Sequence, residues 1–303
     1  MALDICSLNS GSNGNCYYLA NEKDAVLIDV GLNCRETEKR MSRLGLSMNK
    51  VRAIFISHEH SDHISGLPVI ARKYQLPVYI TPGTRMRGRL SLQDDLARSF
   101  KAHECIRIGD LQITAFPKLH DASEPHSFIV RCREITVGVF TDIGFPCENL
   151  IRYFKQCNAA FLEANYDDGM LDSGRYPFFL KQRIRGGNGH LSNRQALELF
   201  TTSRHSNMSH LFLSHLSKDN NCPHLLLELF RKSAGETQIV IAPRDRETEV
   251  YCIRPAENQD RISLALDTDR EHSKSPVAAV DRGMPDLLQT KIPVQDNLQY
   301  TLF

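Results

Sequence analysis

Ser57-His58-Glu59-His60-Ser61-Asp62-His63 is the stretch that decides how this chain folds and which chemistry to look for. It follows the β-branched and aromatic run Val51–Ile56, which predicts a buried strand. Isolated histidines are usually structural residues. Three histidines and one aspartate packed this closely instead predict a metal site in the loop after a strand.

The spacing within this stretch predicts two ions. His58 and His60 are two residues apart on extended backbone, so they point to the same side and can share one ion. Asp62 and His63 lie where the chain turns into a helix that begins near Ile64, and they can reach a second ion. Four ligands cannot complete two coordination spheres, so we expect further ligands at the ends of later strands.

Three polar residues follow later apolar runs in the way that His58 follows Val51–Ile56. They are His120 after Ile113–Leu119, Asp142 after Val137–Thr141, and His215 after His210–Ser214. One such residue alone is more often an ordinary loop residue. Repetition of the arrangement over four predicted strands favours a shared metal centre.

The composition is that of a globular protein. The 303 residues are 41% hydrophobic and 24% charged, and the formal net charge of +1 gives no general attraction to nucleic acid. Any polyanion must therefore bind to local basic patches. Nine scattered cysteines without a Cys-x-x-Cys pair predict reduced thiols and a cytoplasmic protein. No apolar run of about 18 residues predicts a membrane span, and the N-terminus lacks a leader pattern.

Alternating strands and helices predict an α/β fold with two sheets packed face to face and helices outside. Besides Val51–Ile56, the predicted strands are Leu3–Leu8, Cys16–Ala20, Ala25–Val30, Pro77–Ile80, Leu111–Pro117, Ser127–Arg131, Thr136–Thr141, Ala159–Glu163, His210–Ser214, Gln238–Ala242 and Glu249–Ile253. The predicted helices are Arg35–Leu44, Ile64–Tyr74, Thr84–Ser99, Cys147–Cys157, Leu171–Arg185, Ser192–Thr202 and Pro223–Ser233. Because the composition becomes polar and proline-containing after Arg254, we expect one domain over residues 1–253 and a flexible tail over residues 254–303.

Five segments, in order, resemble the metallo-β-lactamase superfamily. They are Leu27-Ile-Asp-Val-Gly31, Ser57–His63, Leu119-His120, Thr141-Asp142 and Leu213-Ser-His215. The resemblance implies a four-layer αββα sandwich with a dinuclear site at the edge of both sheets. It implies two divalent ions, Zn²⁺ or Mn²⁺, with iron as a further possibility.

The resemblance also implies a role for each candidate ligand. One ion would take His58, His60 and His120, the other would take Asp62, His63 and His215, and Asp142 would bridge them. Asp29 would hold the histidine loop in place, and Asp62 would also take part in catalysis. Antibiotic-hydrolysing members have cysteine at the position of Asp142, whereas phosphodiester and thioester hydrolases have aspartate, so β-lactam hydrolysis is disfavoured.

A second set of segments is similar to the YycJ/WalJ family of this superfamily. They are Ser10–Asn15, His126, Glu163-Ala-Asn165, Arg175-Tyr-Pro177, Gly189–Asn193 and Ser214–Asn221. This resemblance implies a cytoplasmic metal-dependent nuclease with 5′-to-3′ exonuclease activity on DNA, in replication or repair. The ligands alone indicate only a hydrolase. A small-molecule hydrolase of a thioester, lactone or cyclic nucleotide, an RNA nuclease and an iron redox protein stay as alternatives.

Glu163 and His190 are candidate catalytic residues. Glu163 ends its predicted strand and can orient His190 so that this histidine donates a proton to the leaving oxygen. Two alternatives stay open for His190. It can support the loop without a chemical role, or it can be the metal ligand in place of His215.

Substrate contacts are expected from two regions. The loop Asn9–Asn15, with Ser12, Asn13 and Asn15, can present backbone amides to an anion, or it can be a plain hairpin turn, which Asn13-Gly14 suits. Basic residues are the other source of phosphate contacts, and the alternative for each is an exposed helix face. They are Arg85, Arg87 and Arg89 in one cluster, and Arg175, Arg183 and Arg185 in the other.

The last five residues, Gln299-Tyr-Thr-Leu-Phe303, resemble the short peptides with which bacterial DNA-processing enzymes dock into the replicative sliding clamp. Gln299, Leu302 and Phe303 would make the contacts, with the two apolar side chains in a pocket of the clamp. The alternative is a C-terminal strand that packs on the core.

Overall fold

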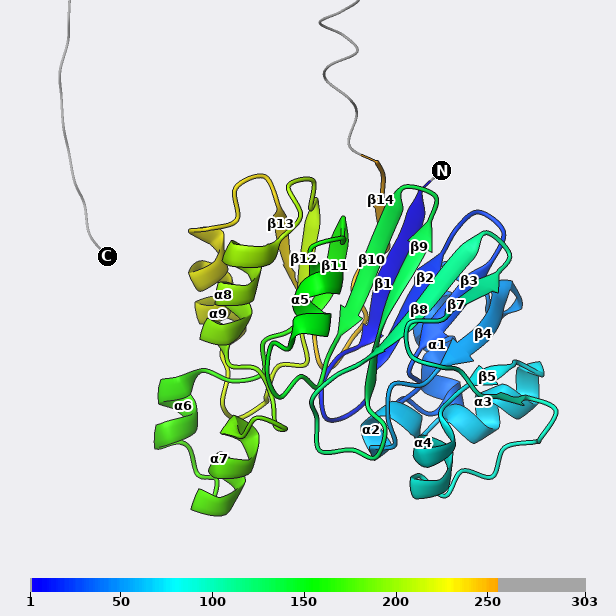
Figure 1. The fold of residues 1–303 in the computed structure, drawn as a ribbon, viewed down its shortest axis with the longest axis horizontal. Helices are drawn as coiled ribbons and strands as arrows, with labels where there is room; N and C mark the ends of the chain where they lie inside the picture. The colour runs from blue at the N-terminus through cyan, green and yellow to red at the C-terminus, as the bar shows by residue number, and fades with distance from the viewer. Residues whose placement is uncertain (1, 256–303) are drawn as a thin grey trace, which may run out of the picture. The chain divides into compact units, whose positions relative to one another are not determined.

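The computed structural model describes residues 2–255, which form two seven-stranded mixed sheets (Figure 1). The strand order is β14-β1-β2-β3-β4-β5-β6 in the first sheet and β13-β12-β11-β10-β9-β8-β7 in the second. The first sheet contains β1 (Leu3–Asn9), β2 (Cys16–Ala20), β3 (Ala25–Ile28), β4 (Val51–Phe55), β5 (Val78–Tyr79), β6 (Ala97–Arg98) and β14 (Tyr251–Ile253). The second contains β7 (Cys105–Ile108), β8 (Leu111–Pro117), β9 (His126–Cys132), β10 (Ile135–Phe140), β11 (Ala159–Glu163), β12 (His210–Ser214) and β13 (Gln238–Ile241).

The two sheets pack against each other through a buried apolar layer to which both contribute. Strand β2 shows the two-residue period that this requires. Tyr17 and Leu19 join the layer between the sheets, with Phe161 and Phe212 from the second sheet. The alternate residue Tyr18 points to the helices outside the first sheet. Both faces of the strand are therefore buried.

Helices cover the outer face of each sheet, which confirms the predicted αββα sandwich. On the first sheet lie α1 (Cys34–Arg43) and α3 (Leu67–Tyr74), and on the second lie α5 (Glu148–Phe154), α8 (Asn193–Ser203) and α9 (Pro223–Arg231). The remaining helices are the 3₁₀ helix η1 (Met48–Lys50), α2 (Ser61–Ile64), α4 (Pro82–Arg87), α6 (Asp168–Ser173) and α7 (Phe178–Arg185). Among the described residues, no helix combines the length and apolar character needed to cross a membrane.

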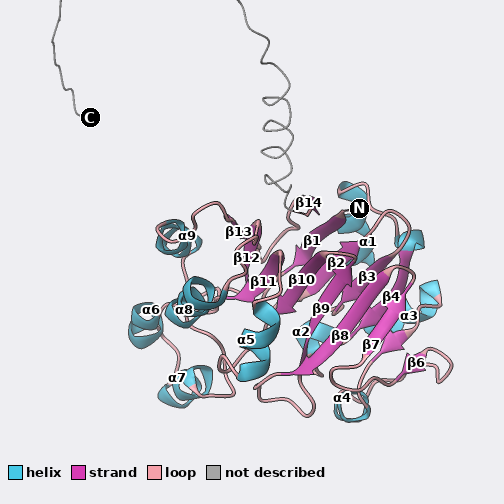
Figure 2. Ribbon diagram, turned by 45° about the horizontal axis from the view of Figure 1, so that its top comes forward, coloured by secondary structure: helices cyan, strands magenta, loops and turns pink. Residues whose placement is uncertain are grey.

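Parallel strand pairs determine the position of the candidate metal ligands. Strands β3 and β4 run parallel in the first sheet, and β10, β11 and β12 run parallel in the second. The segments that follow their carboxyl ends meet at one edge of the sandwich, where α2 also lies (Figure 2). The candidate ligands after β4, β10 and β12 are thereby brought together from distant parts of the chain.

Two of the predicted helices are interrupted. The helix expected over Ile64–Tyr74 is split into α2 and α3, because Gly66 lies against the carbonyl of Leu32, where a Cβ would overlap it, and Pro68 begins a new helix. The stretch Leu171–Arg185 is likewise two helices, α6 and α7. Pro177 is the N-cap of α7 and ends any continuous helix there.

The helix predicted over Thr84–Ser99 is wrong beyond Arg87. Helix α4 ends at Gly88, and Arg89 adopts the left-handed region at φ 49°. The chain then extends the first sheet, because Ala97 pairs in parallel with Val78. Strand β7, which the sequence analysis missed, pairs with β8 in a hairpin. At β6 strand pairing overrides the local helical preference, whereas the isoleucines of β7 themselves favour a strand.

The predicted division into residues 1–253 and 254–303 stays a prediction. Residues 256–303 lie outside the described part of the chain, and with them the candidate clamp-binding residues Gln299, Leu302 and Phe303.

Candidate metal centre

Asp29 anchors the histidine loop to the end of β3. Its Oδ1 accepts a hydrogen bond from the backbone N–H of Ser57 at 2.8 Å, and its Oδ2 accepts from Ser57 Oγ at 2.8 Å. The same Oδ2 lies 2.7 Å from Nδ1 of His63. All three residues are buried. Asp29 therefore fixes the orientation of the His63 ring and leaves its Nε2 for another partner.

Three residues of the site hold a left-handed backbone that non-glycine residues rarely adopt. Asp29 has φ 59°, and Asp142 and His215 each have φ 55°. Each follows the carboxyl end of a strand, so the turn aims its side chain into the edge where the two sheets meet. Strained backbone at positions of this kind is common in functional sites.

Three overlapping groups of potential ligands form at this edge. The first is His58, His60 and His120, and the second is Asp62, His63, Asp142 and His215. A third combines Asp142 and His215 with Glu163 and His190. Within each group the ligand atoms all lie within 4.8 Å of one another. The first two groups contain the seven residues that the sequence analysis proposed as ligands.

Asp142 lies between the first two groups. Its Oδ2 is 3.1 Å from Nε2 of His63, and its Oδ1 is 3.8 Å from Nε2 of His120. The carboxylate therefore faces one imidazole from each group, which is the position that a bridging ligand requires.

The donor atoms fit divalent cations. Asp142 Oδ2 and His215 Nε2 are buried and make no well-aligned hydrogen bond among the described residues, although His63 Nε2 lies 3.1 Å from Asp142 Oδ2. Such atoms are costly to bury unless a cation binds them. Burial holds the pKa of His58 well below its ordinary value and lowers the pKa of His120 to about 4. Both imidazoles are therefore neutral at pH 7 and have a lone pair to offer.

The carboxylates of the second group are ionised. Burial alone would raise the pKa of Asp142, but the nearby His215 and His63 hold it well below its usual range. The same two imidazoles lie against Asp62, whose pKa is also lowered. Despite burial, the carboxylates raise the pKa of His63 well above its usual value and that of His215 to about 10. The balancing positive charge therefore lies on these two imidazoles, and a bound metal ion would supply it in place of their protons.

Glu163 joins the candidate proton donor to the candidate ligand. It is fully buried, and its Oε1 lies 2.7 Å from Nδ1 of His190 and 2.9 Å from Nδ1 of His215. Burial would raise its pKa, but His190 and His215 lower it to about 2. The carboxylate therefore accepts from both rings and turns both Nε2 atoms away from itself. Its Oε2 accepts the backbone N–H of Ile143 at 2.6 Å.

The geometry separates the roles of the two histidines. His215 belongs to the group with Asp62, His63 and Asp142, whereas His190 joins it only in the group that also contains Asp142 and Glu163. His190 is also more exposed, at 23% of its side chain against 3% for His215. This favours His215 as the ligand and leaves His190 facing the cavity.

A cavity of about 300 Å³ opens over the first two groups. Its lining includes Ser12, His60, Asp62, His120, Asp121, Asp142, Asn165, Tyr176, Leu180, Arg183, Ile184, Gly189, His190, His215 and Ser217. Of the predicted substrate residues, Ser12 and Arg183 therefore lie at the cavity. Arg183 forms an ion pair with Asp121 at 2.5 Å. Arg175 and Arg185 do not line it, and Arg185 pairs with Asp172 on α6.

The glycine-rich loop after β1 does not present a free row of amides. Gly14 N–H donates to the carbonyl of Gly11, and Asn15 N–H donates to the carbonyl of Asp62 at 2.7 Å. Asn13 donates from its side chain to the carbonyl of Arg244. The loop is a six-residue hairpin connection, which is longer than the two-residue turn that Asn13-Gly14 suggests. Asn15 instead holds the metal loop, since its Nδ2 also lies 3.1 Å from Asp62 Oδ2.

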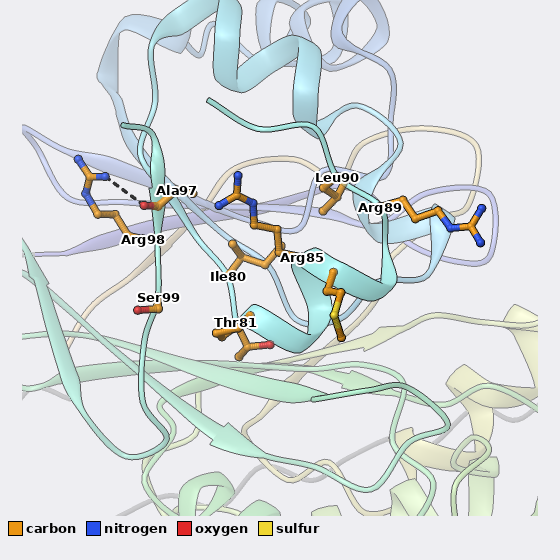
Figure 3. A pocket seen from close by; sticks show the side chains of 10 residues that line it. Ile80, Thr81, Arg85, Arg89, Leu90, Ala97, Arg98 and Ser99 are labelled. Carbon is orange, nitrogen blue, oxygen red and sulfur yellow. Dashed lines mark hydrogen bonds between the residues drawn. The ribbon is translucent and has the colours of Figure 1, made fainter. Parts of the chain in front are cut away.

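The basic cluster on α4 borders a different cavity, of about 560 Å³ (Figure 3). Arg85, Arg89 and Arg98 contribute to its lining, and none of the seven candidate ligands does. Arg85 is paired with Asp94 at 2.8 Å. The prediction that this cluster flanks the metal centre therefore has no support in the described structure.

Lys118 is a feature that sequence reasoning missed. Its side chain is buried and donates to the carbonyl of Thr141 at 2.7 Å, next to Asp142. Burial lowers its pKa. The only signal in the sequence is a lysine inside an otherwise apolar run, and such a lysine usually reaches solvent with its charged end.

Comparison with known proteins places this architecture in a family. The family model described as "Beta-lactamase superfamily domain" matches residues 24–215, which include all seven candidate ligands. The chain belongs to the metallo-β-lactamase superfamily. Membership confirms the predicted fold, identifies the chain as a hydrolase, and implies a centre for divalent metal ions.

Relatives place the chain more narrowly in the YycJ/WalJ family. It is 35% identical over 239 residues to "Exodeoxyribonuclease YycJ" of Bacillus anthracis, covering 78% of this chain and 89% of that protein. It is 32% identical over 223 residues to "Exodeoxyribonuclease WalJ" of Streptococcus pneumoniae D39, covering 72% and 83%.

Solved metallo-β-lactamase structures share the fold at low identity. YhfI of Bacillus subtilis superposes with a TM-score of 0.64 at 16% identity, over 83% of this chain and all of that protein. Zn²⁺-bound PqqB of Methylobacterium extorquens superposes with a TM-score of 0.63 at 13% identity, over 81% of this chain and 99% of that protein.

Proposed function

We propose that this chain is a dimetal phosphodiesterase that digests DNA from the 5′ end, in replication or repair. The single observation that carries the proposal is the position of Asp142 between two groups of ligands. The names of the YycJ and WalJ relatives support DNA as the substrate. The nine free cysteines, all of them within the described residues, support the reducing environment of the cytoplasm.

In this proposal His58, His60 and His120 hold one ion, and Asp62, His63 and His215 hold the other, with Asp142 shared. Zinc and manganese both accept sets of imidazole and carboxylate ligands, and iron does as well. When bound, two divalent ions supply activated water and stabilise negative charge on a phosphate. That chemistry suits a phosphodiester.

His190 assists the departure of the leaving oxygen. Its Nδ1 donates to Glu163, which turns Nε2 away from this carboxylate, and the ring lines the cavity. In the imidazolium form Nε2 also carries a proton, which passes to the leaving oxygen and leaves the ring neutral with its proton on Nδ1. Glu163 keeps the ring in this orientation. In this proposal Arg183 and Ser12, which line the cavity, contact phosphate oxygens, and Arg183 exchanges its ion pair with Asp121 for the phosphate.

One assay tests the proposal against its alternatives. The purified protein is offered duplex DNA labelled at the 5′ or the 3′ end, the matching RNA, and a small thioester, each with Mn²⁺ or Zn²⁺. We expect digestion of DNA from the 5′ end, and its loss in the Asp62→Ala and His60→Ala variants. Activity that survives in both variants would come from a contaminant, and hydrolysis of the thioester alone would overturn the assignment.

We also propose that residues 299–303 dock the enzyme to the replicative sliding clamp. The support is the resemblance of Gln299-Tyr-Thr-Leu-Phe303 to clamp-binding peptides.

A further inference from the structure

Helix α7 packs only loosely on the rest of the protein. None of its residues is buried, and its first two, Phe178 and Phe179, are 75% and 73% exposed. Figure 1 shows α6 and α7 projecting beyond the edge of the sheets at which the metal centre lies. Exposure of two adjacent phenylalanine side chains to water is unfavourable in free energy. Exposed apolar groups of this kind often mark interaction sites.

The same helix forms a wall of the metal cavity. Leu180, Arg183 and Ile184 line that cavity. Phe179 and Arg183 are four residues apart and lie on one face of the helix, so Phe179 lies next to the wall and farther out. The helix is also joined to the catalytic loop, because His190 N–H donates to the carbonyl of Ile184 at 2.9 Å.

Helix α7 itself carries basic residues only. They are Lys181, Arg183 and Arg185, of which Arg183 is paired with Asp121 and Arg185 with Asp172 on neighbouring segments. The two phenylalanines begin the helix, and the three basic residues follow them toward the catalytic loop. Aromatic rings beside basic groups, continuous with a phosphodiesterase site, are the features with which proteins bind single-stranded nucleic acid.

We propose that Phe178 and Phe179 form a stacking platform for the unpaired bases of a DNA strand whose end lies in the metal cavity. This inference rests on the proposed function and narrows its substrate to a single-stranded terminus. The flat faces of bases are accessible only when they are unpaired, so a duplex cannot use the platform. Stacking on phenylalanine accepts every base, which suits digestion without sequence preference.

Three double variants and two controls test the platform. The double variants replace both phenylalanines with alanine, with leucine or with tyrosine, and because both side chains are exposed all three should fold. Leucine keeps the apolar surface without a ring, and tyrosine keeps the ring. The controls are Leu225→Ala on α9 and Val69→Ala on α3, which remove side chains that are 54% and 47% exposed and lie on helices that cover the outer faces of the sheets.

The first measurement is binding. A fluorescent phosphorothioate oligothymidylate of about 12 nucleotides, which resists hydrolysis, is titrated against the metal-loaded protein. We expect the Kd to rise at least about fivefold in the alanine and leucine variants and to stay within about twofold in the tyrosine variant and both controls. An unchanged Kd in the alanine variant, or full binding by the leucine variant, would overturn the platform.

The second measurement is turnover. For single-stranded DNA we expect the KM of the alanine variant to rise, whereas kcat/KM for bis(p-nitrophenyl) phosphate should not change, because that substrate reaches only the metals. If the wild type digests no DNA, the proposed function is wrong. The binding titration still shows whether Phe178 and Phe179 bind single-stranded DNA. Loss of a dimer in the alanine variant, with unchanged DNA binding, would assign the phenylalanines to contact with a second copy.

Discussion

His215 donates from Nδ1 to Oε1 of Glu163 across 2.9 Å, and the same oxygen accepts from His190 at 2.7 Å. One buried carboxylate thus orients both a candidate metal ligand and the candidate proton donor. Binding of the second ion and proton transfer therefore depend on the same residue, although they are separate tasks. A mutation of Glu163 should therefore affect both tasks, whereas a mutation of His190 should affect proton transfer alone.

Replacement of Glu163 with glutamine should impair both tasks. A neutral amide can no longer accept well from two imidazoles, so the His215 and His190 rings lose their orientation. We expect metal affinity to fall about 10- to 100-fold, together with a lower kcat. Titration with Zn²⁺ in the presence of a competing chelator measures the metal affinity. DNA digestion at saturating metal then measures kcat. Unaltered metal affinity would show that Glu163 does not support His215.

His190→Ala should affect only the chemical step. Because His190 is placed outside the ligand set, the variant should keep the metal content of the wild type. Its kcat should fall about 10²- to 10⁴-fold, the usual contribution of a general acid. Elemental analysis and single-turnover kinetics of the same preparation provide the check. Loss of metal from this variant would make His190 a ligand and return His215 to another role.

Asp29→Ala should weaken the metal site without touching a ligand. Without this carboxylate, Ser57 and His63 lose three hydrogen bonds that hold the histidine loop. We expect about 10- to 100-fold weaker metal binding, measured by the same chelator competition. Asp24→Ala is a suitable control, since Asp24 forms an exposed pair with Arg52. Equal affinities in the two variants would contradict the anchoring role.

Gly31→Ala should destabilise the fold through the metal loop. A Cβ on Gly31 would overlap the carbonyl of Asp62 and crowd the backbone of Asn15. Overpacking of this kind costs about 1–3 kcal/mol in the free energy of unfolding. Gly187→Ala, where a Cβ meets nothing within 4 Å, should stay within about 0.5 kcal/mol of the wild type. Denaturant unfolding compares the two, and equal midpoints would contradict the close approach.

The sequence predicts the parts of the site that follow strand ends. His58, Asp142 and His215 are recognisable because an apolar run precedes each one, and parallel strands bring such positions to one edge. The sharing of Glu163 by two histidines is not predictable in this way, since it depends on the spacing of β11 and β12. The same is true of Asn15, whose contact with Asp62 joins residues 47 positions apart.

The errors in secondary structure have two causes. Residues 88–99 contain good helix formers, yet Ala97 and Arg98 form an edge strand because β5 offers an unpaired edge there. Local preference carries no information about an edge elsewhere in the fold. Proline and glycine at Pro177 and Gly66 were visible in the sequence, and they divide both helices that were predicted as continuous.

Deletion of residues 299–303 should separate docking from digestion. If these residues bind the sliding clamp, the shortened protein should lose clamp binding in a pull-down or by surface plasmon resonance. Its rate on naked DNA should match that of the full chain, because every candidate ligand lies between His58 and His215 in the sequence. Clamp binding that persists after the deletion would dispose of the docking proposal.

The number of metal ions bound per chain tests the central claim most directly. Elemental analysis after dialysis should find about two divalent ions in the wild type and about one each in His60→Ala and His215→Ala, which remove ligands from different groups. The two single variants should both lose DNA digestion. A wild-type protein with no bound metal, or variants that keep the full metal content, would contradict a dinuclear centre built from these residues.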